Sequence, residues 1–483
     1  MKSSVEEPNI LLVVCDTLRP DYISPYNKER ETPFFDRFAE SGTIFEQAFA
    51  AGPGSSISHA ALFSGQYPST NGVGGQVDFP PTKPHIADLL REAGYTTFGM
   101  PGPSRIGSHW NYDRGFEEYL EKWKDIPSSI SFGDLKRGIE NPSLVSPMPK
   151  EVLRRAVYGD DDFTSYLIDV FSNKTQSLEE PWFSFINITT AHGPYNPPRP
   201  YKQKKVPELN RSKLGFLEPI TSEYISRQDV HLDKITEMND PSGFAKLLAD
   251  SQHLSTAELE TMRALYEASV DYLDNQLSRL FGRLESSGAL DNTIVVLVSD
   301  HGEHLGENGL TRHMYFHFEP CLHVPLMMSG PSIPAGSTRS DFVSLIDILP
   351  TLCGKSNIAV PASVDGQDLF EAPPRDAVFA ENGVRETPTV FEDHLPPEMV
   401  DRLGRGLKSI RTTEHLYTID SSGEERLYDR ESETELPNPD PESLTRYRNR
   451  VHETLGTEFP PGSQEESYSE AIRQDLEHLG YLE

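Results

Sequence analysis

At 483 residues the chain is long enough to bury a large core, and a length of this order predicts two or three structural units. Asp and Glu number 75 against 44 Lys and Arg, and the resulting formal net charge of −31 argues against nonspecific binding to nucleic acid or to anionic membrane surfaces. The acidic residues are scattered rather than gathered in a tail, which is typical of a solvated surface and consistent with a halophilic source.

The N-terminal segment and the cysteines indicate the cellular compartment of the protein. The apolar run after the acidic N-terminus is much shorter than a signal-peptide core, and no stretch approaches the roughly 20 apolar residues of a membrane span. Cys15, Cys321 and Cys353 are an odd and sparse set, so we expect buried thiols and neither a disulfide framework nor a zinc site. We therefore expect a cytoplasmic protein.

The first predicted elements are a strand and two helices. Asn9 to Cys15 is a nearly continuous apolar run that ends in Asp16, as in a strand buried on both faces of a mainly parallel sheet. Pro33 to Phe38 and Ile86 to Leu90 are predicted helices that lead toward strands. Residues 120 to 255 are less regular and rich in Pro, Asp and Lys, so we expect long excursions there that shape a pocket.

A second strand that ends in Asp follows a long predicted helix. Thr293 to Val298 is an apolar run that continues into Ser299 and Asp300. Ligands of an open α/β sheet bind at the carboxyl ends of its strands, so we expect Asp16 and Asp300 to face one site. The helix before this strand is a crossover helix with apolar residues at helical spacing, which are Leu265, Tyr272, Leu273, Leu277, Leu280 and Leu284.

The pattern changes after residues 347–350. Alternating stretches and a Ser-Ser-Gly turn predict a small antiparallel sheet over Leu407 to Thr412, His415 to Ile419 and Arg426 to Tyr428. We expect an α/β catalytic domain over residues 1–355, with a central mostly parallel sheet between helices, and a smaller C-terminal α+β subdomain over residues 356–483. The tail beyond about Pro437 is polar and gives little information.

Four segments carry residues suited to ester chemistry. They are VVCDTLRPDY (13–22), GPGSSISHAALFSGQYPSTNGV (52–73), TTAHGPY (189–195) and VSDHGEHLGENG (298–309). In this order they resemble the sulfatase family of the alkaline-phosphatase superfamily. The resemblance covers most of the chain, and it implies that family's fold, a central mostly parallel sheet flanked by helices.

The resemblance implies that Asp16, Asp300 and His301 hold one divalent metal ion together with Ser55. Carboxylates are hard oxygen ligands suited to Ca²⁺, Mg²⁺ or Mn²⁺, and the imidazole shifts the preference toward Mn²⁺. Such an ion also supplies a local positive centre that attracts an anionic substrate against the field of the whole chain. Family members commonly carry two adjacent Asp residues at the first position, whereas Asp16 is followed by Thr17, as in the single-Asp phosphonate and sulfate monoester hydrolases.

Ser55 falls where the family carries its nucleophile, a Cys or Ser at the junction of a loop and a helix. A metal ion and helix N-terminal amides there stabilise an alkoxide and an incoming oxyanion. Ser56 is the alternative nucleophile. Many family members oxidise this residue to formylglycine, but the Pro and Arg of the modification signal are Ile57 and His59 here. We therefore expect an unmodified hydroxyl, as in the Ser or Thr nucleophiles of alkaline phosphatases and phosphoglycerol transferases.

Three histidines and a few charged residues near the motifs are further candidates for the site. His59 stands where the family has Arg, and an imidazole is cationic only part of the time near neutral pH. His192 and His313 fall where the family places donors to the substrate oxygens or the leaving-group acid, although a histidine in a loop is more often structural. For Arg19 we favour an ion pair with Asp21 over binding of an anionic substrate, and Glu303 and His304 are either partners of the metal ligands or solvated turn residues.

The sequence thus predicts a sulfuric ester hydrolase that acts on a small-molecule or glycan sulfate ester through one metal ion and Ser55, or a formylglycine derived from it. The main alternative is a phosphomonoesterase, phosphodiesterase or phosphoalcohol transferase on the same scaffold. An alternative of another class is a catalytically silent binding protein that has kept the fold.

Overall fold

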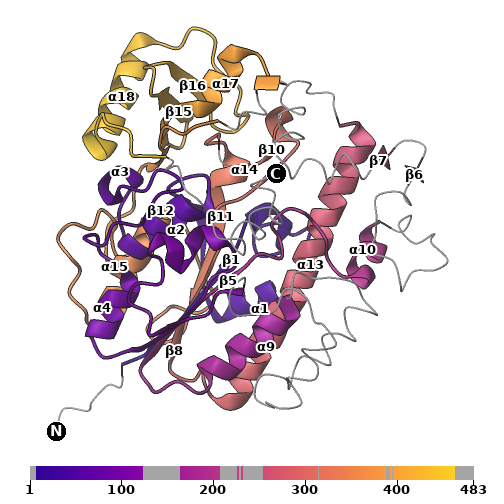
Figure 1. Cartoon of the computed structure of the whole chain (residues 1–483), viewed down its shortest axis with the longest axis vertical. Coiled ribbons are helices and arrows are strands. Elements are labelled where there is room, and N and C mark those ends of the chain that lie inside the picture. Colours follow the sequence, from indigo (N-terminus) through magenta and orange to yellow (C-terminus); the bar gives the residue numbers. More distant parts are fainter. Residues whose placement is uncertain are drawn as a thin grey trace.

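The centre of the molecule is an eight-stranded sheet between two layers of helices (Figure 1). The computed structural model describes residues 7–122, 164–206, 226–227, 230–231, 254–313, 315–387, 392–393 and 395–462. In spatial order the strands are β12 (Ser337–Ser344), β2 (Gly42–Phe49), β11 (His323–Ser329), β8 (Thr293–Val298), β1 (Asn9–Cys15), β5 (Trp182–Ile188), β3 (Thr96–Met100) and β4 (Glu118–Tyr119). Only β11 runs antiparallel to its neighbours in this sheet, which confirms the predicted mostly parallel α/β fold.

Helices cover both faces of the sheet, and the predicted ones are confirmed. One layer contains α2 (Ser55–Ser64), α4 (Ile86–Glu92) and α15 (Ile348–Lys355). The other layer contains α1 (Pro33–Ser41), α9 (Thr164–Thr175) and the long α13 (Thr256–Ser287). Shorter elements on the periphery are α3 (Pro68–Asn71), α10 (Arg199–Lys205), α14 (Glu319–Leu322), and the strand pairs β6 (Ser226–Arg227) with β7 (Val230–His231) and β9 (His304–Leu305) with β10 (Thr311–Arg312).

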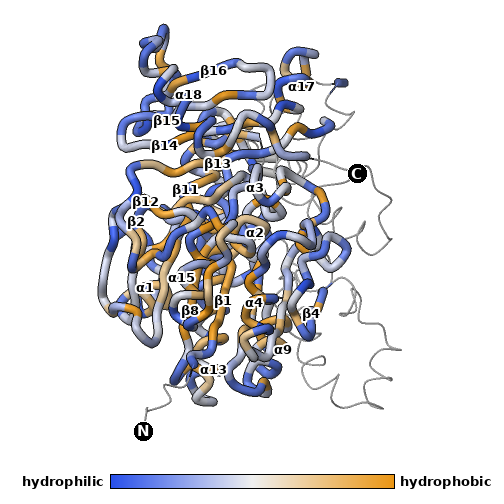
Figure 2. The backbone as a smooth tube through the Cα atoms, turned by 90° about the vertical axis from the view of Figure 1, so that its left-hand side faces the viewer, coloured by the Kyte–Doolittle hydropathy of each residue, from blue (hydrophilic) through white to orange (hydrophobic). Residues whose placement is uncertain are grey.

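Strand β1 contributes to both halves of the core. Its alternate residues Ile10, Leu12 and Val14 pack in the layer of α2, whereas Leu11, Val13 and Cys15 pack in the layer of α13. Figure 2 shows the hydrophobic colour along β1 and β8 in the middle of the molecule. Because both faces are covered, the strand is apolar throughout, as the uninterrupted run in the sequence predicts.

Two segments are more regular than the sequence suggested. The stretch predicted to be irregular contains β5, which lies beside β1 in the centre of the sheet; its apolar run is broken by Ser184 and Asn187, and this hides the strand pattern. The tail predicted to carry little information contains α18 (Pro441–Leu455). That helix buries the single stripe Tyr447, Val451 and Leu455, which is too narrow to stand out in a polar segment.

The predicted antiparallel sheet near the C-terminus is confirmed, and it gains one strand. It consists of β13 (Val378–Asn382), β14 (Leu407–Arg411), β15 (His415–Asp420) and β16 (Glu425–Asp429), and is flanked by α17 (Pro397–Gly404) and α18. This sheet shares a hydrophobic cluster with the main domain, in which Ile410 and Tyr417 pack with Ala61 of α2. The separate subdomain over residues 356–483 remains a prediction.

Two further expectations concern the described part of the chain. Within it, no helix is both long enough and apolar enough to cross a membrane. The three cysteines are buried and form no disulfide, as predicted.

Candidate active site

The carboxyl ends of β1, β8 and β5 bring three polar side chains to one place. Val14 of β1 is in register with both Val298 of β8 and Asn187 of β5. Asp16 and Asp300 each lie two residues beyond that register position, so their side chains continue the face that Val14 and Val298 present to α2. The structure therefore brings the two strand-end carboxylates together, as the sequence predicts.

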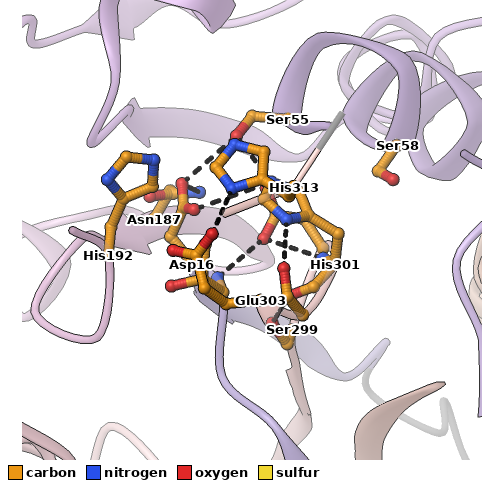
Figure 3. A network of polar contacts seen from close by, with 12 residues as sticks. Asp16, Ser55, Ser58, Asn187, His192, Ser299, His301, Glu303 and His313 are labelled. Carbon is orange, nitrogen blue, oxygen red and sulfur yellow. Dashed lines mark hydrogen bonds and ion pairs between the residues drawn. The ribbon is translucent and has the colours of Figure 1, made fainter. Parts of the chain in front are cut away.

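Ser55 is the first residue of α2 and points at these strand ends. Its Oγ lies 3.4 Å from Asp16 Oδ2 and 3.2 Å from His301 Nε2 (Figure 3). On the same helix, the Ser58 hydroxyl points away from Asp16 and donates to a backbone carbonyl at 2.8 Å. Within the described part of the chain, no hydrogen bond joins the side chain of Ser56 to Asp16 or His301. Of the candidate nucleophiles, only Ser55 thus makes these contacts.

Asp16, Asp300 and His301 form a group that fits one metal ion. Each offers one ligand atom, and these atoms lie within 4.8 Å of one another. The Nδ1–H of His301 donates to the carbonyl of Gly302 at 2.9 Å, which directs Nε2 toward the carboxylates, 3.5 Å from Asp300 Oδ2. Asp16 Oδ1, Asp300 Oδ2 and Asn187 Oδ1 are buried and have no hydrogen-bond partner among the described residues. Buried, unpaired oxygens are costly, and a hard divalent cation such as Ca²⁺, Mg²⁺ or Mn²⁺ satisfies them.

The two carboxyl groups have opposite pKa shifts. Burial, followed by the negative charge of Asp300, raises the pKa of Asp16 well above its ordinary value. Burial also acts to raise the pKa of Asp300, but the charge that His301 and His59 carry when protonated, together with hydrogen bonds from the Ser55 hydroxyl and the His301 amide, outweighs burial and lowers that pKa. Without a cation, the pair therefore holds its proton preferentially on Asp16.

His59 lies one turn after Ser55 on α2 and is buried. Its Nδ1–H donates to the Ser55 carbonyl at 2.8 Å, and its Nε2 accepts from the Asn187 amide at 3.2 Å. This pattern requires a neutral ring, and burial is the main cause that lowers its pKa. The same Asn187 amide lies 3.3 Å from Asp16 Oδ2. His59 therefore positions its neighbours and does not supply the permanent positive charge of the family's Arg.

Asn187 and Tyr266 belong to the site, and the sequence analysis missed both. Asn187 was detectable as a polar residue in a buried strand next to a candidate motif. Tyr266 lies on α13, and its hydroxyl donates to the carbonyl of Thr17 at 2.8 Å and accepts from the amide of Arg19 at 2.9 Å. Thr17 has a left-handed backbone, with φ 58°, and its amide lies 3.4 Å from Asp300 Oδ1. Tyr266 thus holds the strained turn that follows Asp16.

His192 and His313 lie beside His301. The ring centroid of His313 is 4.3 Å from that of His301 and 5.2 Å from that of His192. The Nδ1–H of His313 donates to Glu303 Oε1 at 2.8 Å, and the Nδ1–H of His192 donates to the carbonyl of Gly193 at 2.5 Å. Burial, followed by the neighbouring His313, lowers the pKa of His192 to about 3. In Figure 3 the ring of His313 lies next to His301, and the ring of His192 lies at the left edge of the cluster.

The remaining candidates are buried charged groups. Arg19 forms the predicted ion pair with Asp21 at 2.8 Å, and its guanidinium also contacts Glu307 at 2.9 Å. Glu303 and His304 are both buried, so the alternative that they are solvated turn residues is wrong. Glu303 orients His313, whereas neither ring nitrogen of His304 has a hydrogen-bond partner in the described part of the chain.

Comparisons with known proteins show the family to which the chain belongs. The family model described as Sulfatase matches residues 8–358. Arylsulfatase K of Danio rerio is 25% identical over 374 residues, which are 76% of this chain and 68% of that protein. Choline-sulfatase of Rhizobium meliloti is 25% identical over 455 residues, which are 88% of this chain and 81% of that protein. The matched family segment contains every candidate residue named above.

A solved structure shares the fold over nearly the whole chain. The phosphonate monoester hydrolase of Agrobacterium radiobacter superposes with a TM-score of 0.68 at 22% sequence identity. The superposition covers 93% of this chain and 95% of that protein.

Proposed function

We propose, from the premise that this chain belongs to the sulfatase family, that it hydrolyses sulfate monoesters with Ser55 as the nucleophile and with one divalent metal ion. The proposal rests on one observation, the position of the Ser55 hydroxyl beside the residues that could hold a metal ion. The Ser55 hydroxyl, at the N-terminus of α2, lies within 3.4 Å of Asp16 and His301, two members of the group that fits a metal ion.

Asp16, Asp300 and His301 are the residues that would hold the ion, with Asn187 Oδ1 beside them. When bound, a divalent cation stabilises negative charge on ester oxygens and lowers the pKa of a hydroxyl next to it. The protein's part is to fix the ligands before substrate arrives. The hydrogen bond from His301 to Gly302 fixes the tautomer, and the bonds from Tyr266 fix the turn after Asp16.

Ser55 provides the covalent step. The Ser55 hydroxyl gives up its proton to solvent, its oxygen bonds to the sulfur of the ester, and the bond from sulfur to the alcohol oxygen breaks. The backbone amides of the first turn of α2 face the incoming oxyanion, because the first amides of a helix have no partner within the helix. Water then releases sulfate from the seryl ester and restores the hydroxyl.

A histidine donates the proton that the departing alcohol oxygen needs. His192 and His313 are the candidates, because both rings lie beside the metal group and both are fixed through Nδ1. His192 is neutral at neutral pH, since its pKa is about 3 in the substrate-free protein. A bound anionic ester favours the charged ring and raises that pKa toward the range in which a general acid works.

The test compares esters, metals and two adjacent serines. Chelated protein is assayed with 4-nitrophenyl sulfate, with 4-nitrophenyl phosphate and with a phenylphosphonate ester, before and after addition of Mn²⁺, Mg²⁺ or Ca²⁺. We expect metal-dependent turnover with preference for the sulfate, loss of nearly all turnover in Ser55→Ala, and retention in Ser56→Ala. Turnover that persists in Ser55→Ala rejects this nucleophile. No turnover of any ester with any metal supports the silent binding protein instead.

A second candidate function is hydrolysis of phosphate or phosphonate esters at the same site. Ile57 and His59 in place of the modification signal favour an unmodified serine, and a seryl phosphate is open to attack by water. A seryl sulfate, in contrast, lacks the collapse that frees sulfate from a formylglycine enzyme. A clear preference for the phosphate or phosphonate ester in the same assay would select this function over the first.

A further inference from the structure

We propose that Arg19 is a positioning residue that joins the two loops which carry the candidate metal ligands. One loop is the turn after β1, with Asp16, and the other follows β8, with Asp300 and His301. The inference rests on the proposed function in one respect, because it takes these residues as ligands of a divalent ion. It goes beyond the ion pair with Asp21, which by itself gives Arg19 only a local structural role.

The guanidinium group of Arg19 contacts both loops. Within its own turn, its Nε and Nη2 donate to the two carboxylate oxygens of Asp21 at 2.9 and 2.8 Å. In the loop after β8, its Nη1 donates to the Glu303 carbonyl at 3.0 Å and to Glu307 Oε1 at 2.9 Å. A planar guanidinium presents its donors in a rigid fork, so it holds such partners in one relative position. These contacts therefore fix the distance between the two loops.

The backbone of Arg19 is held as firmly as its side chain. Its amide donates to the Tyr266 hydroxyl at 2.9 Å, and that hydroxyl donates to the Thr17 carbonyl at 2.8 Å. Its guanidinium carbon lies 5.3 Å from the centre of the Tyr22 ring, which packs edge-on against Tyr266 with the ring centres 4.7 Å apart. Only 6% of Arg19 is exposed. A buried side chain with these bonds has little freedom to follow a moving loop.

The loop after His301 lies directly against the Arg19 side chain. A Cβ on Gly302 would lie 3.4 Å from Arg19 Cγ and 2.1 Å from the carbonyl oxygen of Pro320. A side chain at this position would force the backbone of α14 to shift, so glycine lets the loop pass between Arg19 and α14. The position of His301, one residue earlier, thus depends on the place that Arg19 occupies.

Two glutamates extend the connection from Arg19 to His313. Glu307 accepts from Arg19 through Oε1 and from the Leu305 amide through Oε2, the latter at 2.6 Å, which holds the turn between β9 and β10. The backbone carbonyl of Glu303 accepts from Arg19, and its side chain accepts from His313 at 2.8 Å. Movement of this loop would therefore displace a candidate metal ligand and a candidate proton donor together.

The contacts of Arg19 oppose a repulsion within the metal group. Asp16 Oδ1 and Asp300 Oδ2 have no hydrogen-bond partner among the described residues, and two ionised carboxylates side by side repel each other. Without an ion, the loops that carry them must be held together by other contacts, and Arg19 supplies such contacts. Ligands that are already in place lose little freedom when the ion binds, so residues that hold them typically contribute about tenfold to 100-fold to metal affinity.

The first experiment measures Mn²⁺ binding to the full chain by electron paramagnetic resonance, which needs no substrate. We expect Arg19→Gln to raise the Kd for Mn²⁺ at least about tenfold, and Arg19→Lys, which keeps the charge but not the fork, to raise it by a smaller factor.

The matched control is Arg339→Gln on β12, the outermost strand of the sheet. Like Arg19 with Asp21, Arg339 binds both oxygens of Asp341 through Nε and Nη2, at 3.0 and 2.7 Å, and its Nη1 donates to the Leu369 carbonyl. This variant should lose a similar ion pair and keep the Kd of the wild type. A wild-type Kd in the Arg19 variants, or in Arg19→Lys where Arg19→Gln does not fold, overturns the proposal.

Hydrogen exchange in chelator separates a failure of this proposal from a failure of the proposed function, because it reports local opening of each loop without metal or ester. We expect the amides of residues 16–18 and 302–307 to exchange at least about tenfold faster in Arg19→Gln, since the lost hydrogen bonds involve charged groups. The same amides should exchange at the wild-type rate in Arg339→Gln. Unchanged exchange of these two loops in Arg19→Gln overturns the proposal. A wild type that binds no Mn²⁺, combined with faster exchange of both loops in Arg19→Gln, would reject the metal ion of the proposed function and still support the connection made by Arg19.

Discussion

Replacement of Asp16 by Asn is expected to stabilise the metal-free protein and to abolish its stabilisation by a divalent ion. Asn has the shape of Asp, and its side-chain oxygen can keep the contact with the Asn187 amide, which is 3.3 Å long. The other oxygen, Oδ1, has no hydrogen-bond partner among the described residues that the substitution would remove. The main effect is therefore the loss of a negative charge beside Asp300.

The expected gain follows from the distance between the two carboxylates. Their ligand atoms lie within 4.8 Å of each other. Two unit charges at this separation repel by about 3.5 kcal/mol when the effective dielectric constant is about 20. Because the pKa of Asp16 is raised, a proton already relieves part of this repulsion in the wild type. We therefore expect the free energy of unfolding to rise by about 1–3 kcal/mol in Asp16→Asn.

Urea denaturation in chelator, and again with saturating Mn²⁺, Mg²⁺ or Ca²⁺, measures both effects. An ion at about 100 times its Kd should stabilise the wild type by about 2.7 kcal/mol and leave Asp16→Asn unchanged. Asp347→Asn is a matched control, because Asp347 is buried but forms an ion pair with Arg375, so its neutralisation should destabilise the protein. Asp16→Asn that is less stable than the wild type in chelator, or equally stabilised by the ion, would refute the reasoning.

Four other predictions test neighbouring claims. Intact and peptide mass spectrometry of protein from its native source should show unmodified serine at Ser55, whereas a mass deficit that matches oxidation to the aldehyde would contradict it. Tyr266→Phe leaves two buried backbone groups without their partner, so urea denaturation should show a loss of about 2–4 kcal/mol, and an unchanged midpoint would remove the positioning role. Mainly through burial, the pKa of Asp274 is raised to about 6, so the wild type should lose stability as pH rises from about 4 to about 6, while Asp274→Asn should not; parallel stability curves would contradict the shift. The melting temperature should rise between about 0.1 M and about 1 M NaCl, as the Debye length falls from about 10 Å to about 3 Å, and a flat series would remove the halophilic interpretation.

The sheet and the two strand-end carboxylates were predictable because they depend on local patterns. A continuous apolar run identifies a strand covered on both faces, and parallel strands end at the same edge. Asp16 and Asp300 therefore follow from two runs of sequence read separately. Asn187 did not follow, because Ser184 and Asn187 break the apolar run of β5, and nothing local indicates that β5 lies beside β1.

Local sequence patterns could not predict the contacts between distant segments of the chain. Tyr266 is one of many apolar or aromatic residues on α13, and only its position in space shows that its hydroxyl reaches the turn after Asp16. The residue type alone also could not show whether the His59 ring is charged or neutral. A histidine in place of the family's Arg could have been charged near neutral pH, but burial and its bonds to Ser55 and Asn187 require the neutral ring.

A neutral His59 changes where the site keeps its positive charge. In the family pattern an Arg next to the nucleophile adds a permanent cation, whereas here α2 offers only its amide dipoles. Under the proposed function, the attraction of an anionic ester would therefore depend on the divalent ion that Asp16, Asp300 and His301 would hold. A site whose positive charge depends on one ion loses its attraction for the ester when that ion is chelated, and salt weakens what attraction remains.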